Sequence, residues 1–177
     1  MPFRFDKLTI KAQEAVARAQ ELAAGAGNPQ IEPVHLLASL LKEDAGIVRP
    51  VLEKVGANVG QLDKIVEAEM KHLPRSSGGS PPGVGPQLSK VLDAAQAEAD
   101  GMKDEFVSTE HLLLALTGSK SKAQEVLELN AIDKNKVLAA LQAVRGSARV
   151  TDQSPEGKFQ ALEKYGIDLV ERARQGK

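Results

Sequence analysis

The chain has 177 residues, with 23 Lys and Arg against 24 Asp and Glu, and it contains neither Cys nor Trp. This charge balance argues against a nucleic-acid partner, which needs a clustered basic excess. The lack of Cys excludes disulfides, thiol chemistry and thiolate metal sites. No apolar run approaches the roughly 20 residues of a membrane span, and no apolar signal core is present. We therefore expect a cytoplasmic protein that does not contact membranes.

Apolar residues recur at helical spacing along the chain, and no stretch alternates with the period of two that a strand requires. The first helix is predicted over residues 10–24, with Thr9 as its N-cap and with Gly25 and Gly27 as its stops. A second begins at Pro33, because proline suits the first position of a helix. A third follows, and a fourth starts near Asn58, a residue type that favours N-caps. This pattern predicts an all-α fold.

The same series of helices then occurs a second time. Residues 31–41, IEPVHLLASLL, are matched 76 positions later by residues 107–117, VSTEHLLLALT. The apolar stripe of the first helix keeps this offset: Ala12, Ala15, Val16, Ala19 and Ala23 correspond to Leu88, Val91, Leu92, Ala95 and Ala99. We predict two pseudo-symmetric four-helix repeats, one over about residues 9–73 and the other over about residues 85–145.

Two segments rich in Gly, Ser and Pro lie outside these repeats. Residues 74–86, PRSSGGSPPGVGP, are predicted to form a flexible bridge between the copies, and residues 146–157 a second flexible linker. Residues 158–177 place apolar side chains along one face and predict a C-terminal amphipathic helix. We expect residues 1–145 to fold as one domain on their own, because both copies lie within them.

Several stretches carry a resemblance to a known family. The doubled unit with IEPVHLLASLL and VSTEHLLLALT is similar to the Clp amino-terminal domain of AAA+ unfolding chaperones. The opening FDKLTIKAQEAV and the closing ALEKYGIDL, followed by ARQGK, most resemble ClpB-type disaggregases, in which the closing segment leads into an ATPase module that this chain lacks. The chain has no G-x-x-x-x-G-K-[ST] loop, so nothing in it is built to cradle nucleotide phosphates.

The resemblance implies a non-catalytic domain that engages exposed apolar segments of unfolded or aggregated proteins through a hydrophobic groove. It also implies that this part of the protein is monomeric and holds no cofactor. The full-length protein would be a homohexameric ATPase that uses ATP and magnesium and works with a DnaK-type chaperone system. The alternative within the family is an adaptor-docking domain of a protease-linked unfoldase of the ClpA or ClpC type.

Two further classes of function stay open outside the family. A structural spacer would show no affinity for unfolded protein. A stand-alone hydrolase would need a nucleophile with a partnered base, and the sequence offers none.

The candidate binding site lies at the seam between the two copies, where the second copy carries the bulkier apolar stripe. If part of that stripe is exposed, it forms an apolar patch of the kind that usually marks an interaction site. The resemblance places Thr9, Asp104 and Glu110 beside the family's substrate-binding surface. The predicted substrate-binding residues are Thr9, Leu88, Val91, Leu92, Asp104, Glu110 and His111.

Simpler roles are open for the same residues. Leu88 and Leu92 are equally well explained as core residues between the copies, since Leu is usually fully buried. Thr9 suits a helix N-cap. His111 and its counterpart His35 lack carboxylates at a dependable ligand spacing, so we interpret them as residues that hydrogen-bond at helix starts. No metal site is predicted.

Overall fold

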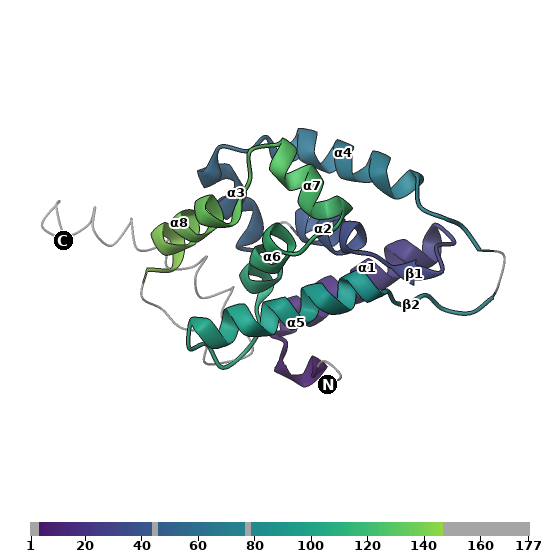
Figure 1. Ribbon diagram of the computed structural model, residues 1–177, viewed down its shortest axis with the longest axis horizontal. Coiled ribbons are helices and arrows are strands. Elements are labelled where there is room, and N and C mark those ends of the chain that lie inside the picture. Colours follow the sequence, from purple (N-terminus) through teal and green to yellow (C-terminus); the bar gives the residue numbers. More distant parts are fainter. Residues whose placement is uncertain (1–3, 44–45, 77–78, 147–177) are drawn as a thin grey trace, which may run out of the picture.

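The computed structural model describes residues 4–43, 46–76 and 79–146 (Figure 1). This described part contains eight α-helices, one 3-10 helix and two strands of two residues each, so the predicted all-α fold of two four-helix repeats is confirmed. After η1 (Phe5–Lys7), the first repeat comprises α1 (Ile10–Gly25), α2 (Pro33–Lys42), α3 (Val48–Val55) and α4 (Val59–Lys71), and the second comprises α5 (Pro86–Gly101), α6 (Thr109–Gly118), α7 (Lys122–Leu129) and α8 (Lys134–Arg145).

Two predicted segments cannot be compared with the structure. The linker beyond Gly146 and the helix predicted over residues 158–177 lie outside the described residues. That residues 1–145 fold on their own stays a prediction. Among the helices that the structure describes, none combines the length and the apolar content needed to cross a bilayer.

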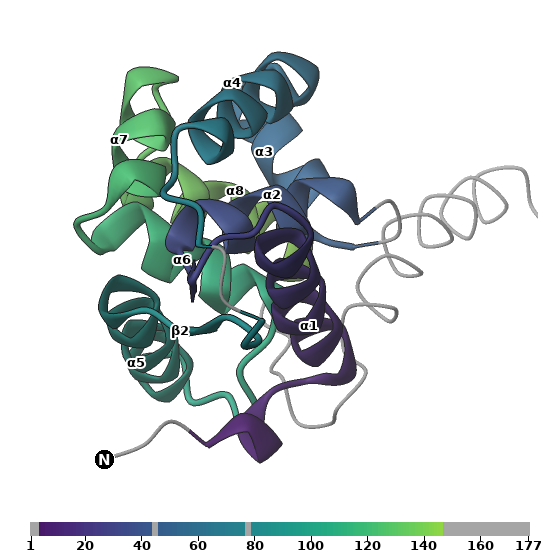
Figure 2. The ribbon, with the colours of Figure 1, turned by 90° about the vertical axis from the view of Figure 1, so that its right-hand side faces the viewer.

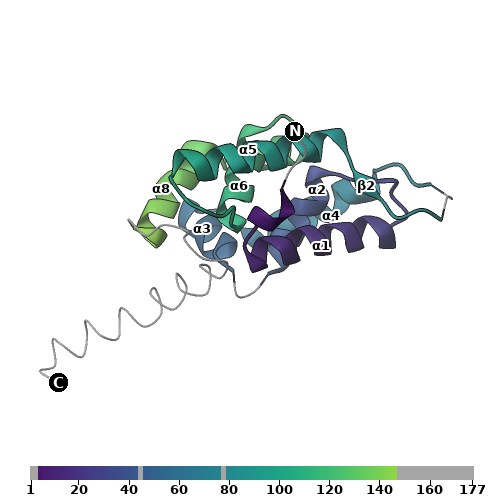
Figure 3. The ribbon, with the colours of Figure 1, turned by 90° about the horizontal axis from the view of Figure 1, so that it is seen from below.

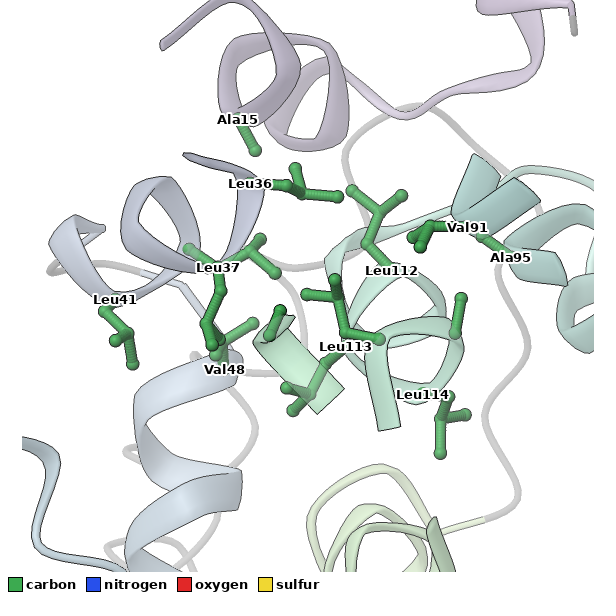
Figure 4. Close-up of a cluster of buried hydrophobic side chains, with 14 of the residues drawn as sticks. Ala15, Leu36, Leu37, Leu41, Val48, Val91, Ala95, Leu112, Leu113 and Leu114 are labelled. Atoms are coloured by element: carbon green, nitrogen blue, oxygen red, sulfur yellow. The ribbon is translucent and has the colours of Figure 1, made fainter. Parts of the chain in front are cut away.

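Helices α2 and α6 lie at the centre of the molecule, and the other helices surround them (Figure 2). Both are apolar on nearly every face, and all their residues from Pro33 to Leu41 and from Thr109 to Thr117 are buried. Helix α1 packs on α2, and α5 packs on α6. Figure 4 shows the side chains of Leu36, Leu112 and Leu113 meeting in the core between the two copies. The amphipathic outer helices therefore cover a shared core rather than two separate ones.

The two copies are also joined by backbone pairing. Leu8 and Val107 form a parallel bridge, in which the N–H of Val107 donates to the carbonyl of Lys7 at 2.8 Å. Figure 3 shows η1 lying between α1 and α5 at this seam. The N-terminal segment of the first copy is thereby fixed against the segment that precedes α6 in the second.

The bridge between the copies is more ordered than its composition predicts. Strand β1 (Gln30–Ile31) pairs in parallel with β2 (Gly83–Val84). The side-chain amide of Asn28 donates to the carbonyl of Pro74 at 2.9 Å, and the N–H of Ser76 donates to the carbonyl of Gly27 at 2.7 Å. The expectation of a flexible bridge over residues 74–86 is therefore wrong for the parts that the structure describes. Gly, Ser and Pro predict an irregular backbone, and here its polar groups pair with the first repeat.

The turns that end the helices repeat as well. Of the two predicted stops, Gly25 lies inside α1, and Gly27 is the left-handed residue of the turn that follows, with φ +72°. Its counterpart in the second copy is Lys103, with φ 59°. After α3 the left-handed residue is Gly56, and its counterpart after α7 is Ala131, with φ 60°. The second copy has the same left-handed turn geometry at Lys103 and Ala131, although it lacks the glycines that adopt this conformation without strain.

Candidate functional site

The seven predicted binding residues all lie in the interior, and none exposes more than 7% of its surface. The side chains of Leu88, Val91 and Leu92 lie on the inner face of α5, which packs on α6, and Figure 4 shows Val91 facing Leu112. The interpretation of Leu88 and Leu92 as core residues is therefore confirmed, and the alternative that this stripe is exposed as an apolar patch is wrong. An apolar neighbour covers them, and burying each such side chain contributes roughly 1.5–3 kcal/mol to stability.

Thr9 is buried and forms hydrogen bonds where the two copies meet, so it does not lie at the rim of an open groove. Its hydroxyl oxygen accepts a hydrogen bond from the N–H of Ala12 at 3.1 Å, which confirms Thr9 as the N-cap of α1. Its own N–H donates to the carbonyl of Val107 at 2.9 Å. Thr9 thus fixes the start of α1 at the point where the two copies meet.

Asp104, Glu110 and His111 belong to a buried polar cluster with Arg145, the last residue of α8. The guanidinium of Arg145 donates to both carboxylate oxygens of Asp104, at 2.8 Å and 3.0 Å, and to Oε1 of Glu110 at 3.3 Å. Nε2 of His111 lies 2.7 Å from Oδ2 of Asp104. Sequence reasoning did not single out Arg145, because nothing local to it indicates a partner 41 positions earlier.

The two equivalent histidines confirm their predicted role at helix starts. Nδ1 of His35 accepts a hydrogen bond from the N–H of Glu32 at 2.8 Å, and Nδ1 of His111 accepts from the N–H of Ser108 at 2.8 Å. Each ring is therefore neutral, with its proton on Nε2, where His35 donates to the amide oxygen of Asn28. Burial lowers the pKa of His35 to about 4, which agrees with this neutral state.

The exposed apolar surface at the seam belongs to the first copy. A hollow of about 680 Å³ opens between η1 and the outer face of α1. Its lining residues are Phe5, Asp6, Leu8, Gln13, Val16, Ala17 and Gln20. Phe5 exposes 46% of its surface, and Leu8, at the bottom of the hollow, is the residue that pairs with Val107. The sequence signal for Phe5 was an aromatic residue that precedes the Thr9 cap and belongs to no helical stripe.

Comparison with known proteins assigns the family. The family model described as the Clp repeat (R) N-terminal domain matches residues 7–130. The chain therefore belongs to the Clp repeat N-terminal domain family. Within it, the chain is 44% identical over its whole length to the chaperone protein ClpB of Rhodopirellula baltica, and 41% identical over 97% of its length to ClpB of Propionibacterium freudenreichii. It spans about a fifth of each of these relatives.

Solved structures share the same fold. The N-terminal domain of Hsp104 from Candida albicans superposes with a TM-score of 0.76 at 21% identity, covering 85% of this chain and 99% of that domain. A complex of the ClpV N-domain with a VipB peptide matches with a TM-score of 0.62 at 20% identity, covering 76% of this chain and 89% of the other. At such low sequence identities the structural similarity establishes the fold alone and does not identify the ligand of this domain.

Proposed function

We propose that this domain is the substrate-binding module of a ClpB-like, ATP-dependent protein disaggregase, and that it takes exposed apolar segments of unfolded or aggregated proteins. The observation that carries the proposal is the hollow at the seam, with the half-exposed ring of Phe5 at its edge. An aromatic side chain beside an open apolar recess offers a large contact area at a small cost in side-chain entropy. A flexible apolar segment of a client fits such a recess.

In this proposal, the seven residues predicted from the sequence hold in place the elements that form the hollow. Thr9 fixes the first turn of α1, whose outer face forms one wall of the hollow. Asp104, Glu110 and His111 hold the segment that carries Val107. The three apolar residues Leu88, Val91 and Leu92 anchor α5 on the core. Buried as they are, these side chains set the shape of the binding surface and do not touch the client.

The other parts of the mechanism belong to the full-length protein. We propose that the full-length protein is a cytoplasmic homohexamer whose remaining modules bind ATP and magnesium and which works with a DnaK-type chaperone system. The present domain would act as a monomeric unit without a cofactor. Its affinity would be modest, because a flexible client loses conformational entropy on binding and a small recess offers little area in return.

The test is chemical-shift mapping of the domain with a permanently unfolded client, reduced and carboxymethylated α-lactalbumin. We expect perturbations at Phe5, Leu8 and Val16, and several-fold weaker binding by Phe5→Ser. The matched control is Leu129→Ser, since Leu129 is the most exposed of the large apolar residues that the structure describes, at 86%, and lies outside the hollow. Equal loss of binding in both variants would mean that the domain merely has a sticky surface. Perturbations confined to α7 would place the site elsewhere.

A second candidate function is docking of a folded adaptor, as in protease-linked unfoldases of the ClpA or ClpC type. It is favoured by the shared fold with the ClpV N-domain, whose structure is a complex with a VipB peptide. The two functions are separated by competition. An adaptor-docking domain would bind a defined peptide from a folded partner and would not bind carboxymethylated α-lactalbumin. A client-binding domain would bind both the peptide and carboxymethylated α-lactalbumin.

A further inference from the structure

Equivalent positions of the two copies, Asn28 and Asp104, bond to the region where the fourth helix ends, by different chemistry. In the first copy, the amide of Asn28 donates to the carbonyl of Pro74, three residues beyond α4. In the second copy, the position equivalent to Asn28 is Asp104, and its carboxylate holds Arg145 at the end of α8. One position thus secures the exit of both repeats, through a neutral amide in one and an ion pair in the other.

The ion pair is enclosed in the protein. The side chain of Arg145 is 6% exposed, and those of Asp104 and Glu110 are 0% exposed. Both terminal nitrogens of the guanidinium contact the Asp104 carboxylate, in the paired geometry that fixes orientation as well as distance. Because Asp104 lies between α5 and α6, this contact attaches the last turn of α8 to the loop that leads into the seam.

The repeat fold does not require this charge. At the equivalent positions the first copy has Asn28 in place of Asp104, Val34 in place of Glu110 and Met70 in place of Arg145. Val34 is buried, and Met70 packs against the core. Burying ions costs free energy that apolar residues of similar volume do not. The first copy folds without this ion pair. Its presence in the second copy therefore indicates a role other than folding of the repeat.

We propose that Asp104, Glu110 and Arg145 form a clamp that fixes the direction in which the chain leaves the domain after α8. Arg145 is then a positioning residue for whatever follows Gly146. The first exit leads directly into the second repeat and is also held by the backbone pairing of β1 with β2. The clamp is the counterpart of that pairing at the second exit. It does not depend on client binding at the hollow.

The members of the clamp are unequal. Because His111 is neutral, the contacts given for the described residues join two carboxylates to one guanidinium. Asp104 receives both arms of the guanidinium, whereas Glu110 receives one longer bond, and its Oε2 has no hydrogen-bond partner among the described residues. Asp104 and Arg145 therefore carry the clamp, and Glu110 adds to it.

The test measures the placement of α8 instead of stability alone. The chain has no Cys, so Glu105→Cys and Gln142→Cys accept spin labels at two exposed positions, one beside Asp104 and one in the last turn of α8. Pulsed electron-spin measurements give the distribution of distances between the labels. With the clamp intact we expect a narrow distribution. Arg145→Met should roughly double its width, because the paired hydrogen bonds that orient the last turn are lost.

Two further variants keep the outcome interpretable. Asp104→Asn copies the first repeat, where His35 donates to an amide oxygen, so it should fold and still broaden the distribution. Arg18→Met is the control, since Arg18 is partly buried and bonds the carbonyl of Ser39 within the first copy. Its distribution should stay narrow. If Asp104→Asn and Arg145→Met are folded by circular dichroism and keep the narrow distribution, the clamp is overturned. Broadening by Arg18→Met would overturn it equally.

Discussion

The N–H of Thr9 donates to the carbonyl of Val107 at 2.9 Å, so the cap of the first helix in one copy is bonded to the other copy. The same segment supplies Leu8, which lines the hollow. The proposed binding surface therefore involves both copies, because the backbone pairing of Leu8 with Val107 joins the segment that carries η1 to the second copy. On the proposed function, residues of the second copy that hold Val107 in place therefore support the shape of the hollow.

Leu113→Ala should destabilise the domain by roughly 2–5 kcal/mol, because Leu113 is fully buried in the core shared by both copies and its truncation leaves a cavity. Urea denaturation followed by circular dichroism measures this loss. Leu129→Ala is the matched control and should change the free energy of unfolding by less than about 0.5 kcal/mol, because Leu129 is exposed. Similar losses for the two variants would contradict the placement of α6 at the centre.

Much of this architecture could be predicted from the sequence, because the repeat offset aligns helix starts, apolar faces and turns at once. The prediction of which apolar residues are exposed was wrong. Periodicity identifies which face of a helix is apolar, but it cannot say which neighbour covers that face, and α6 covers Leu88, Val91 and Leu92. The hollow at Phe5 and the ion pair of Arg145 arise from contacts between distant segments. The ion pair has no local signature, and the hollow is indicated locally only by Phe5, an aromatic residue outside every helical stripe.

His35 makes the stability of the domain depend on pH. Burial lowers its pKa to about 4 in the folded state, whereas the unfolded chain takes up this proton near pH 6.5. The contribution of neutral His35 is therefore fully present above pH 6.5 and is lost as the pH falls toward 4. The loss reaches about 3 kcal/mol at full titration.

The measurement is the free energy of unfolding as a function of pH in the wild type, His35→Gln and His72→Gln. We expect His35→Gln to remove part of the slope between pH 6.5 and 4. The exposed residue His72 serves as the control for replacing a histidine at the surface. A slope that is identical in all three proteins would contradict the neutral, buried state of His35.

Ala131→Gly should stabilise the domain by up to about 1 kcal/mol, because Ala131 has φ 60° and a residue with a Cβ is strained in this region. Gly56→Ala at the equivalent turn should destabilise the domain by about 1 kcal/mol, since φ there is 98° and a residue with a Cβ is strained at this angle. Both are read from thermal unfolding. Effects of the same sign in both copies would show that the two turns are not equivalent.

Removing residues 147–177 should leave the helical content and the unfolding transition of the domain nearly unchanged, because all eight helices of the described part and the Arg145 contacts lie before residue 147. Calorimetry of the truncated chain ending at Gly146 provides the measurement. A loss of cooperativity on truncation would mean that the removed segment belongs to the core and that the domain boundary lies further along the chain.

Glu110→Gln should cost far less stability than Asp104→Ala, although both positions are fully or nearly fully buried and both contact Arg145. Glutamine keeps an oxygen for the guanidinium and removes the carboxylate charge that one arginine cannot balance, so we expect a change within about 1 kcal/mol. Asp104→Ala leaves the Arg145 cation without its main partner and should cost about 3–5 kcal/mol. Urea denaturation at low and high salt measures both, and salt should alter neither value much, since enclosed charges are poorly screened. A larger loss for Glu110→Gln than for Asp104→Ala would show that Glu110 is the principal partner of Arg145.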